Sequence, residues 1–377
     1  MASILTTLKD KYIAMRGFHT DRHLLIIESD DWGSIRMPSY DTFCKLRRRG
    51  DHPEKDGFLS NDSLENEKDL TALFEVLSSV HDKNGNPVVI TANFVMANPD
   101  FEKIDYHANK YVFEPFYETY KRYDASEKVL DTIKRGMQDR VFYPQLHCRE
   151  HLNVNRWMKA LRDGKPDATL AFENEMIGVF ASFSDSNRFG YMDAFNTDQT
   201  SNDELREILN DAMTIFSETF GYRSKTFVAS CFVWADEFES VLSEQGIAGI
   251  QSAPWQNCAV GEKGNYRLKR KIHYTGQRNR NRQIYTVRNC GYEPAYFQNP
   301  EECVEECFQA VSRSFRDRKP AIINSHRFNY ISRLNPRNAT NNLLGLKLLL
   351  SKIKKEYPDV EFITTSDLID IIQLEGK

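Results

Sequence analysis

Residues 24–34 read LLIIESDDWGS, and this stretch decides the expected fold. Its first part, Leu24–Glu28, is an apolar run that predicts a buried β-strand, and the run leads to the adjacent carboxylates of Asp30 and Asp31. Two neighbouring carboxylates repel each other unless a cation or a proton compensates one of them. An Asp-Asp pair is also common in turns and at helix starts. A plain turn and a charged site at a strand end are therefore both open at this point.

Similar apolar runs recur along the chain, separated by longer segments whose apolar residues lie three and four positions apart. This alternation is the pattern of βα units around a mainly parallel sheet, and it predicts an α/β fold. The predicted strands are Leu24–Glu28, Val88–Val95, Phe142–His147, Phe227–Val233, Ile247–Gln251, Ala321–Ser325 and Glu361–Thr364. The predicted helices are Leu64–Val80, Asn202–Thr219, Glu301–Arg316 and Asn341–Lys355, followed by a closing helix that Ser366 is expected to cap.

Length and charge narrow the class of protein. With 377 residues, 50 Lys and Arg against 54 Asp and Glu, and 40% hydrophobic residues, the chain is typical of a soluble globular protein. This length allows two or three domains of about 150 residues, or one α/β barrel enlarged by insertions. The near balance of charge argues against a protein that coats nucleic acid, so we expect no nucleic-acid partner.

The cysteines and the first residues predict the compartment. The seven cysteines are scattered without a Cys-x-x-Cys pair, which indicates neither a disulfide framework nor a zinc ribbon. Charges at Lys9, Asp10, Lys11 and Arg16 interrupt the first apolar residues, and no later run approaches the length of about 18 apolar residues that a membrane span needs. We expect no signal peptide, no transmembrane segment and a cytoplasmic location. The sequence does not indicate an oligomeric state.

Two later strands also end in residues that bind metals or carry protons. Phe142–His147 leads to His147 and His151, and their spacing of four predicts that both face the same way in a first helical turn. With one carboxylate they would make a three-ligand zinc site that keeps a position open for water, and two independent histidines are the plainer alternative. The strand Ala321–Ser325 is followed by His326, which would either donate a proton to a leaving group or bond a loop carbonyl.

The order of these three sites resembles that of the polysaccharide deacetylase family, the NodB-homology type of carbohydrate esterase. The family's first motif, Thr-Phe-Asp-Asp-Gly, is similar to ESDDWG at residues 28–33. Its second motif, His-(Ser/Thr)-x-x-His, resembles HCREH at 147–151, and its last, Leu-x-His, resembles INSH at 323–326. The resemblance extends from Leu24 to about Ile372. It implies one domain over residues 1–377, a distorted (β/α)7-type barrel of the glycoside hydrolase/deacetylase kind with insertions.

The resemblance also implies a mechanism. Asp31, His147 and His151 would hold a divalent metal, most often zinc. Asp30 would be the general base and His326 would protonate the leaving group. A metal lowers the pKa of its water from about 15.7 to about 7, which suits this role. The implied activity is that of a hydrolase on a non-peptide carbon–nitrogen bond, which removes an acetyl or other small acyl group from a carbohydrate substrate, an amino sugar or a polysaccharide precursor.

The chain departs from the family at the third motif, Arg-Pro-Pro-Tyr-Gly, whose arginine orients the catalytic aspartate. The corresponding segment, Thr226–Trp234, has no arginine, and the candidates to replace it are Arg149, Arg223 and Arg327. The segment that supports the general-acid histidine in the family has Ser252–Trp255 as its nearest counterpart here. The residues that we predict to bind substrate are Trp32, Arg149 and Arg327.

Two segments interrupt the βα pattern. We interpret the aromatic-rich insertion at about 98–125 as a lid or insertion that packs its own small core, in preference to a platform for sugar rings. The basic segment at about 265–291 is predicted to form a β-hairpin around Gly276. It is either a solvated hairpin or an attraction for a phosphate-linked sugar.

Two alternatives to a deacetylase are open. The altered arginine motif leaves room for a deformylase, or for cleavage of another non-peptide amide, on a lipid- or nucleotide-linked sugar. The same change, together with the aromatic insertion, also fits a carbohydrate-binding protein on a catalytically decayed barrel. The presence of all five working side chains favours an active enzyme.

Overall fold

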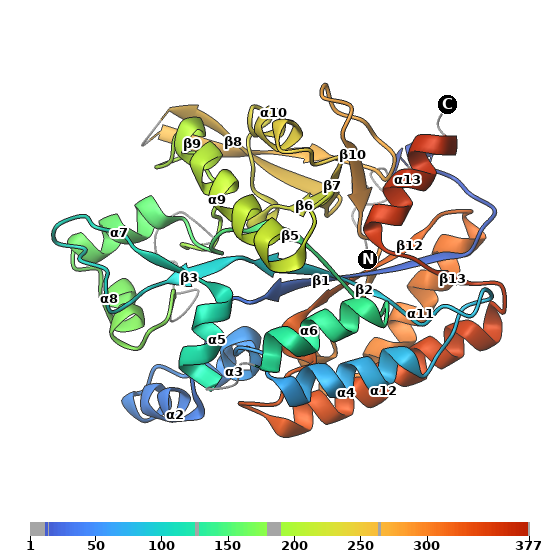
Figure 1. Cartoon of the computed structure of the whole chain (residues 1–377), viewed down its shortest axis with the longest axis horizontal. Helices are drawn as coiled ribbons and strands as arrows, with labels where there is room; N and C mark the ends of the chain where they lie inside the picture. Colours follow the sequence, from blue (N-terminus) through green and yellow to red (C-terminus); the bar gives the residue numbers. More distant parts are fainter. Residues whose placement is uncertain (1–11, 14, 125–127, 179–189, 263–264, 376–377) are drawn as a thin grey trace.

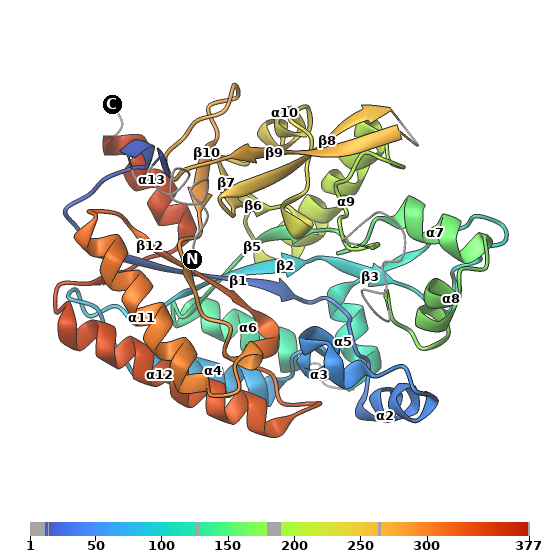
Figure 2. The same cartoon turned by 180° about the vertical axis from the view of Figure 1, so that it is seen from behind.

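The computed structural model describes residues 12–13, 15–124, 128–178, 190–262 and 265–375. Its centre is a curved parallel sheet with helices on the outside (Figure 1 and Figure 2). In spatial order the strands are β10 (Ile284–Val287), β7 (Gly249–Ser252), β6 (Thr226–Val228), β5 (Phe142–Cys148), β2 (Ile90–Val95), β1 (Leu24–Trp32), β12 (Ala321–His326) and β11 (Cys290–Gly291), and β13 (Glu361–Phe362) pairs with the start of β1.

The two outermost strands belong to one stretch of chain. Only Arg288 and Asn289 separate β10 from β11, although these strands pair at opposite edges of the sheet. The Arg288 N–H donates to the carbonyl of Ser252 in β7 at 3.0 Å, and the Asn289 N–H donates to the carbonyl of Ile322 in β12 at 3.1 Å. Residues 284–291 therefore close the sheet. Counted once, this stretch gives seven parallel strands around the barrel among the described residues, with the short β13 as an eighth beside the start of β1, which confirms the predicted (β/α)7-type barrel.

The outer layer is made of helices that turn one apolar side toward the strands. In α9 (Asn202–Phe220), Leu205 and Phe216 are fully buried, a capping box at Ser201 begins the helix, and Gly221 ends it with a left-handed φ of 80°. Burial of each such large side chain contributes about 1.5–3 kcal/mol. The other helices of this layer are α4 (Glu67–Ser78), α6 (Lys128–Gln138), α10 (Phe238–Glu244), α11 (Pro300–Arg316), α12 (Pro336–Glu356) and α13 (Thr365–Glu375).

A group of shorter elements lies near the carboxyl ends of the strands, toward which the arrow of β1 points in Figure 1. These elements lie at this end of the barrel because most of them are insertions between the end of a barrel strand and the helix that covers it. They are α2 (Tyr40–Arg49), α3 (Gly57–Asn61), α5 (Phe116–Asp124), α7 (Val154–Arg162), α8 (Pro166–Glu173) and the antiparallel pair β3 (Ala97–Pro99) and β4 (Phe113–Pro115).

The predicted elements are present with changed ends. All seven predicted strands and all four predicted helices have a counterpart, but β6 stops at Val228, five residues before its predicted end. The chain turns there, because Cys231 and Phe232 adopt left-handed φ angles of 56° and 54° that no strand allows. The cap predicted at Ser366 is wrong by two residues. Thr364 caps α13, and its Oγ1 accepts from the N–H of Asp367 at 3.1 Å.

The aromatic residues of the insertion at about 98–125 pack into two separate hydrophobic clusters. Phe101 and Tyr106 belong to a small hydrophobic cluster around Trp157 of α7, which is separate from the main core. Phe116 and Tyr120 of α5 belong to the main core between the sheet and the helices. The insertion is therefore divided between a small cluster beside α7 and the main core.

The basic segment does not form a hairpin around Gly276. The hairpin of this region joins β8 (Trp255–Glu262) to β9 (Asn265–Ile272), so the alternating residues pair with the preceding segment and not with the following one. Gly276 lies in the connection from β9 to β10, where the side chain of Asn279 accepts from the N–H of Gln283 at 3.0 Å and shapes the loop. Within the described residues, no helix is both long and apolar enough to cross a bilayer.

Candidate metal centre and active site

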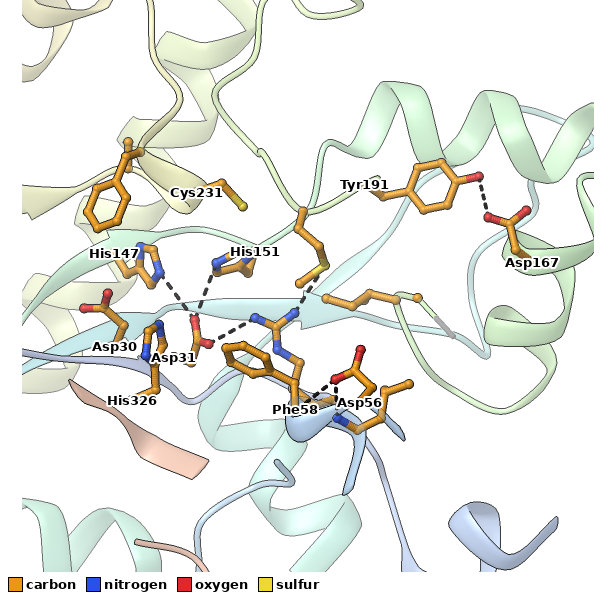
Figure 3. A pocket seen from close by; sticks show the side chains of 17 residues that line it. Asp30, Asp31, Asp56, Phe58, His147, His151, Asp167, Tyr191, Cys231 and His326 are labelled. Carbon is orange, nitrogen blue, oxygen red and sulfur yellow. Dashed lines mark hydrogen bonds and ion pairs between the residues drawn. The ribbon is translucent and has the colours of Figure 1, made fainter. Parts of the chain in front are cut away.

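A cavity of about 310 Å³ opens at the carboxyl ends of β1, β5 and β12 and of the segment after β6. Parallel barrels place their functional residues at this end because the loops that follow the strands converge there. All five predicted catalytic and metal-binding side chains line the cavity (Figure 3): Asp30, Asp31, His147, His151 and His326. The structure thus brings together residues that are up to 296 positions apart in the sequence, since Asp30 and His326 are register partners in β1 and β12.

Adjacent residues of a regular strand point to opposite faces, so Asp30 and Asp31 need an irregularity to share one cavity. The register of β1 against β2 shifts between Ser29 and Trp32, and Asp31 has a left-handed φ of 75°. A bulge of this kind re-aims one side chain at the end of a strand. Both carboxylates therefore face the cavity, which excludes the plain-turn reading of the Asp-Asp pair.

Asp31, His147 and His151 form a compact set of potential metal ligands. Their ligand atoms lie within 4.8 Å of one another. The Oδ1 atom of Asp31 is 3.4 Å from Nε2 of His147 and 3.5 Å from Nε2 of His151. This oxygen is buried and has no hydrogen-bond partner among the described residues. An unsatisfied buried carboxylate oxygen facing two imidazoles fits a divalent cation, and one oxygen with two nitrogens is a common zinc set.

The two histidines do not share a helical turn. His147 lies in β5, and His151 lies in the loop before α7, so the predicted helical geometry is wrong although the predicted proximity is right. Their rings are 4.9 Å apart and nearly perpendicular. Nδ1 of His147 lies 2.9 Å from the carbonyl of Val228, which can only accept a hydrogen bond. Nδ1 therefore carries the proton and leaves Nε2 as the ligating atom.

Electrostatics keeps the ligand set in its metal-binding form. Burial and the nearby guanidinium of Arg36 lower the pKa of His151 to about 3, so its ring is neutral at neutral pH. Burial alone would raise the pKa of Asp31, but the charges of Arg36 and His326 outweigh it and hold the pKa well below its usual range. An anionic carboxylate, as in Asp31, and a neutral imidazole, as in His151, are the forms that bind a metal.

Arg288 makes the contact with Asp30 that was expected of the arginine missing from Thr226–Trp234. Its Nη1 and Nη2 donate to the two carboxylate oxygens of Asp30 at 2.6 and 2.7 Å, and its Nε donates to Glu28 at 2.6 Å. Burial raises the pKa of Asp30, but the attraction of Arg288 outweighs it and lowers the pKa to about 2. Arg288 comes from the junction of β10 and β11, one residue beyond the apolar run Ile284–Val287. The rule that placed the other sites, a functional residue just after a buried strand, would have found it.

The three arginines considered for this role lie elsewhere. Arg149 bonds Glu150 and Asp211, Arg223 bonds Gln245 at the surface, and Arg327 is fully buried against Asp62 and Glu65. None of them is among the described residues that line the cavity. Because each already has its own partners, none orients Asp30.

His326 is held by a carboxylate outside the predicted segment Ser252–Trp255. Its Nδ1 lies 2.6 Å from Oε1 of Glu293, and the side-chain amides of Asn324 and Asn329 also donate to Glu293 at 2.9 and 2.6 Å. Burial lowers the pKa of His326, but Glu293 outweighs it and raises the pKa to about 9. His326 is therefore a cation at neutral pH, ready to donate a proton.

The predicted substrate-binding residues do not reach the cavity. Trp32 is 1% exposed, because the bulge at Asp31 turns it away from the face of Asp30 and into the core against Phe142, with a ring distance of 4.9 Å. Arg149 lies over the ring of Phe113 at 4.3 Å, and Arg327 is completely buried. Substrate binding is therefore not proposed for these three side chains.

Other residues line the space beside the ligand set. Phe58 of α3, Phe232 after β6 and Met192 give it apolar walls, Arg36 gives it a cation, and Tyr191 donates to Asp167 at 3.3 Å (Figure 3). These residues come from loops and short insertions. They follow no strand or helix periodicity, so no pattern in the sequence pointed to them. None of the aromatic residues of the 98–125 insertion is among the described lining residues.

The fold and the site together define a (β/α)7-type barrel with a candidate metal centre. A scan against protein-family models gave no match, and neither did a search of curated proteins. Solved structures with a similar fold include a Mycobacterium smegmatis protein assigned as a polysaccharide deacetylase, at 10% identity and a TM-score of 0.45 over 95% of this chain and 93% of that one.

Two further solved structures come from the same search. A family 4 acetyl xylan esterase from Clostridium thermocellum with a cobalt ion has 11% identity and a TM-score of 0.40 over 94% of this chain and 92% of that one. A CE4 family pseudoenzyme from Bacillus anthracis has 10% identity and a TM-score of 0.41 over 93% and 67%. These likenesses concern the fold alone, and the chemistry of the site follows from this chain's own residues.

Proposed function

We propose that this protein is a metal-dependent hydrolase that removes an acetyl or other small acyl group from an amino group on a carbohydrate. The carrying observation is the unsatisfied Oδ1 of Asp31 between the Nε2 atoms of His147 and His151, with Asp30 and His326 lining the same cavity. A divalent ion held by these three ligands, with zinc as the proposed metal, would supply a Lewis acid that polarises an acyl carbonyl and acidifies water.

Asp30 accepts the proton of the attacking water. The bidentate contact with Arg288 fixes the plane of its carboxylate, and the side-chain amide of Asn93 donates to the same group at 2.7 Å. A carboxylate with a pKa of about 2 is a weak base but is fully ionised at neutral pH. It can therefore take a proton only from acidified water, which makes the base and the metal ligands interdependent.

His326 donates a proton to the departing amine. The pair with Glu293 keeps its ring protonated, and its place at the end of β12 puts it beside Asp30 in β1. Amide hydrolysis requires this step, because an amine leaves poorly as an anion. Asp30 and His326 thus carry the two proton transfers that the proposed reaction needs.

The charges around the cavity favour an uncharged sugar over a phosphate-linked one. Arg36 is the one arginine among the described lining residues, and it already faces Asp31 and Asp62. Asp56 and Asp167 add negative charge to the wall. The exposed basic loop with Arg278, Arg280 and Arg282 precedes β10 and so lies at the opposite end of the barrel.

Acyl release from a panel of N-acylated sugars tests this function. With zinc or cobalt present, we expect acetate from an uncharged N-acetylated oligosaccharide and less from a nucleotide-diphosphate-linked N-acetyl sugar. Asp30→Asn and His326→Gln should each lower kcat by about 10²–10⁴-fold, and Asp163→Asn, a surface change just after α7, should not. Formate release alone would favour a deformylase. Sugar binding without any acyl release would contradict the proposed hydrolase.

A further inference from the structure

Arg36 lies between the candidate metal ligands and the space for substrate. Its side chain is 8% exposed, and its Nη2 donates to Oδ2 of Asp31 at 3.2 Å. Its Nη1 lies 3.2 Å from the sulfur of Met192, and its guanidinium carbon is 5.9 Å from the ring centre of Phe58. Arg36 therefore contacts a ligand carboxylate and two walls of the cavity at once.

The two oxygens of Asp31 have different surroundings. Oδ1 faces His147 and His151, whereas Oδ2 faces the guanidinium of Arg36. A carboxylate can bind a cation through one oxygen or through both. Because a hydrogen bond from a cation occupies Oδ2, only Oδ1 remains for the metal. Three protein donor atoms then leave positions open for water and substrate.

Arg36 is itself held in place from behind. Its Nε lies 3.4 Å from Oδ2 of Asp62. Oδ1 of Asp62 accepts from Nε and Nη2 of Arg327 at 3.0 and 2.8 Å, and Nη1 of Arg327 donates to Glu65 at 2.8 Å. These side chains are almost completely buried. A guanidinium confined by such a network cannot turn away from Asp31 without leaving Asp62 a buried charge with less compensation.

We propose that Arg36 is a positioning residue that restricts Asp31 to one-oxygen coordination of the metal. The inference rests on the proposed metal centre. Arg36 acts through Asp31, and the buried Asp62–Arg327 pair keeps it there. Its second effect is on charge, because a guanidinium on Oδ2 withdraws electron density from the ligand and leaves the ion a stronger Lewis acid.

Cobalt absorption spectroscopy tests this role without relying on turnover. Metal-free wild type, Arg36→Met and Arg36→Lys are each titrated with Co²⁺, whose visible absorbance falls when its coordination number rises. In Arg36→Met both oxygens of Asp31 become available, and we expect the absorbance per bound ion to fall at least about twofold. Lys keeps the charge but cannot contact Asp31 and Asp62 together, so its spectrum should lie between the two.

Arg156→Met is the matched control. Arg156 is also a poorly exposed arginine between two carboxylates, Asp193 and Asp198, but it does not touch the ligand set. Its spectrum should equal that of the wild type. A wild-type spectrum in Arg36→Met would overturn the inference, and if that variant fails to fold, a wild-type spectrum in Arg36→Lys would do so. Failure of the wild type itself to bind Co²⁺ would instead contradict the metal centre.

Discussion

Arg288 links the interior of the barrel to the candidate base. It is 6% exposed and holds Glu28 and Asp30 with three charged hydrogen bonds, so one guanidinium compensates two buried carboxylates. An arginine suits this place better than a lysine because its planar fork bonds both oxygens of Asp30 at once. The same contact that stabilises the folded chain also orients the group proposed to accept a proton.

Loss of Arg288 should therefore cost stability and activity together. Arg288→Met leaves two buried carboxylates without their cation, and we expect the free energy of unfolding to fall by about 3–5 kcal/mol in urea denaturation. Arg288→Lys should restore part of the stability and less of the activity. The surface variant Arg223→Met should change stability by less than about 0.5 kcal/mol. Equal unfolding curves for Arg288→Met and the wild type would show that the pair is not stabilising.

Glu293 sets the charge of His326 and thereby a pH dependence. The pKa of His326 is raised from 6.5 to about 9 in the metal-free fold, so its charged form stabilises the protein below pH 6.5, and this stabilisation is lost as the pH rises through 9. We expect a loss of about 3 kcal/mol across this window in the metal-free wild type. The loss should be absent in Glu293→Gln, whose side chain carries no charge. Parallel stability curves for the two proteins would contradict this account of the pair.

At the scale of the element, the end of β1 shows what the sequence could and could not predict. The apolar run of Leu24–Glu28 and the carboxylates after it predicted a strand and a charged site. The bulge at Asp31 could not be predicted, because it follows from the register with β2. His147 and His151 have a helical spacing but lie on a strand and in a loop. Their spacing therefore predicted correctly that they lie close together, but for the wrong reason. Arg288 was missed because residues 265–291 were interpreted as one basic hairpin, so β10 was not recognised as a barrel strand with a functional residue at its end.

Gly33 makes the turn after this bulge possible, and its replacement should be costly. It has a left-handed φ of 79°, and a Cβ at this position would lie 2.6 Å from the carbonyl oxygen of Val95. Gly50 has a φ of 94° with no atom within 4 Å of a Cβ, so it is a control for the backbone angle alone. In thermal unfolding we expect Gly50→Ala to lower the stability by about 1–3 kcal/mol. Gly33→Ala should lower it by more, because the added Cβ also clashes with the carbonyl of Val95. Equal losses of stability in the two variants would show that the end of β2 shifts to accommodate the added Cβ.

At the scale of the whole molecule, closure of the barrel brings the site together. Residues 284–291 pair with β7 on one side and β12 on the other, and this stretch carries Arg288 to Asp30. An α/β fold with a mainly parallel sheet could be predicted from the recurring apolar runs, whereas the barrel was implied by the resemblance of the three motifs. The closing stretch, the true hairpin of β8 and β9 and the cavity walls could not, because they depend on contacts between distant segments. The basic loop before β10 lies at the opposite end, so its charge is separated from the proposed chemistry.

The most direct test of the account is the metal content of the purified protein, measured by elemental analysis after addition of zinc and removal of loosely bound ions. We predict one divalent ion per chain in the wild type. The ion should be lost from His147→Gln and from His151→Gln. It should be retained by His273→Gln, a histidine buried away from the cavity. A wild-type protein without stoichiometric metal, or an ion that survives both ligand substitutions, would contradict the central claim.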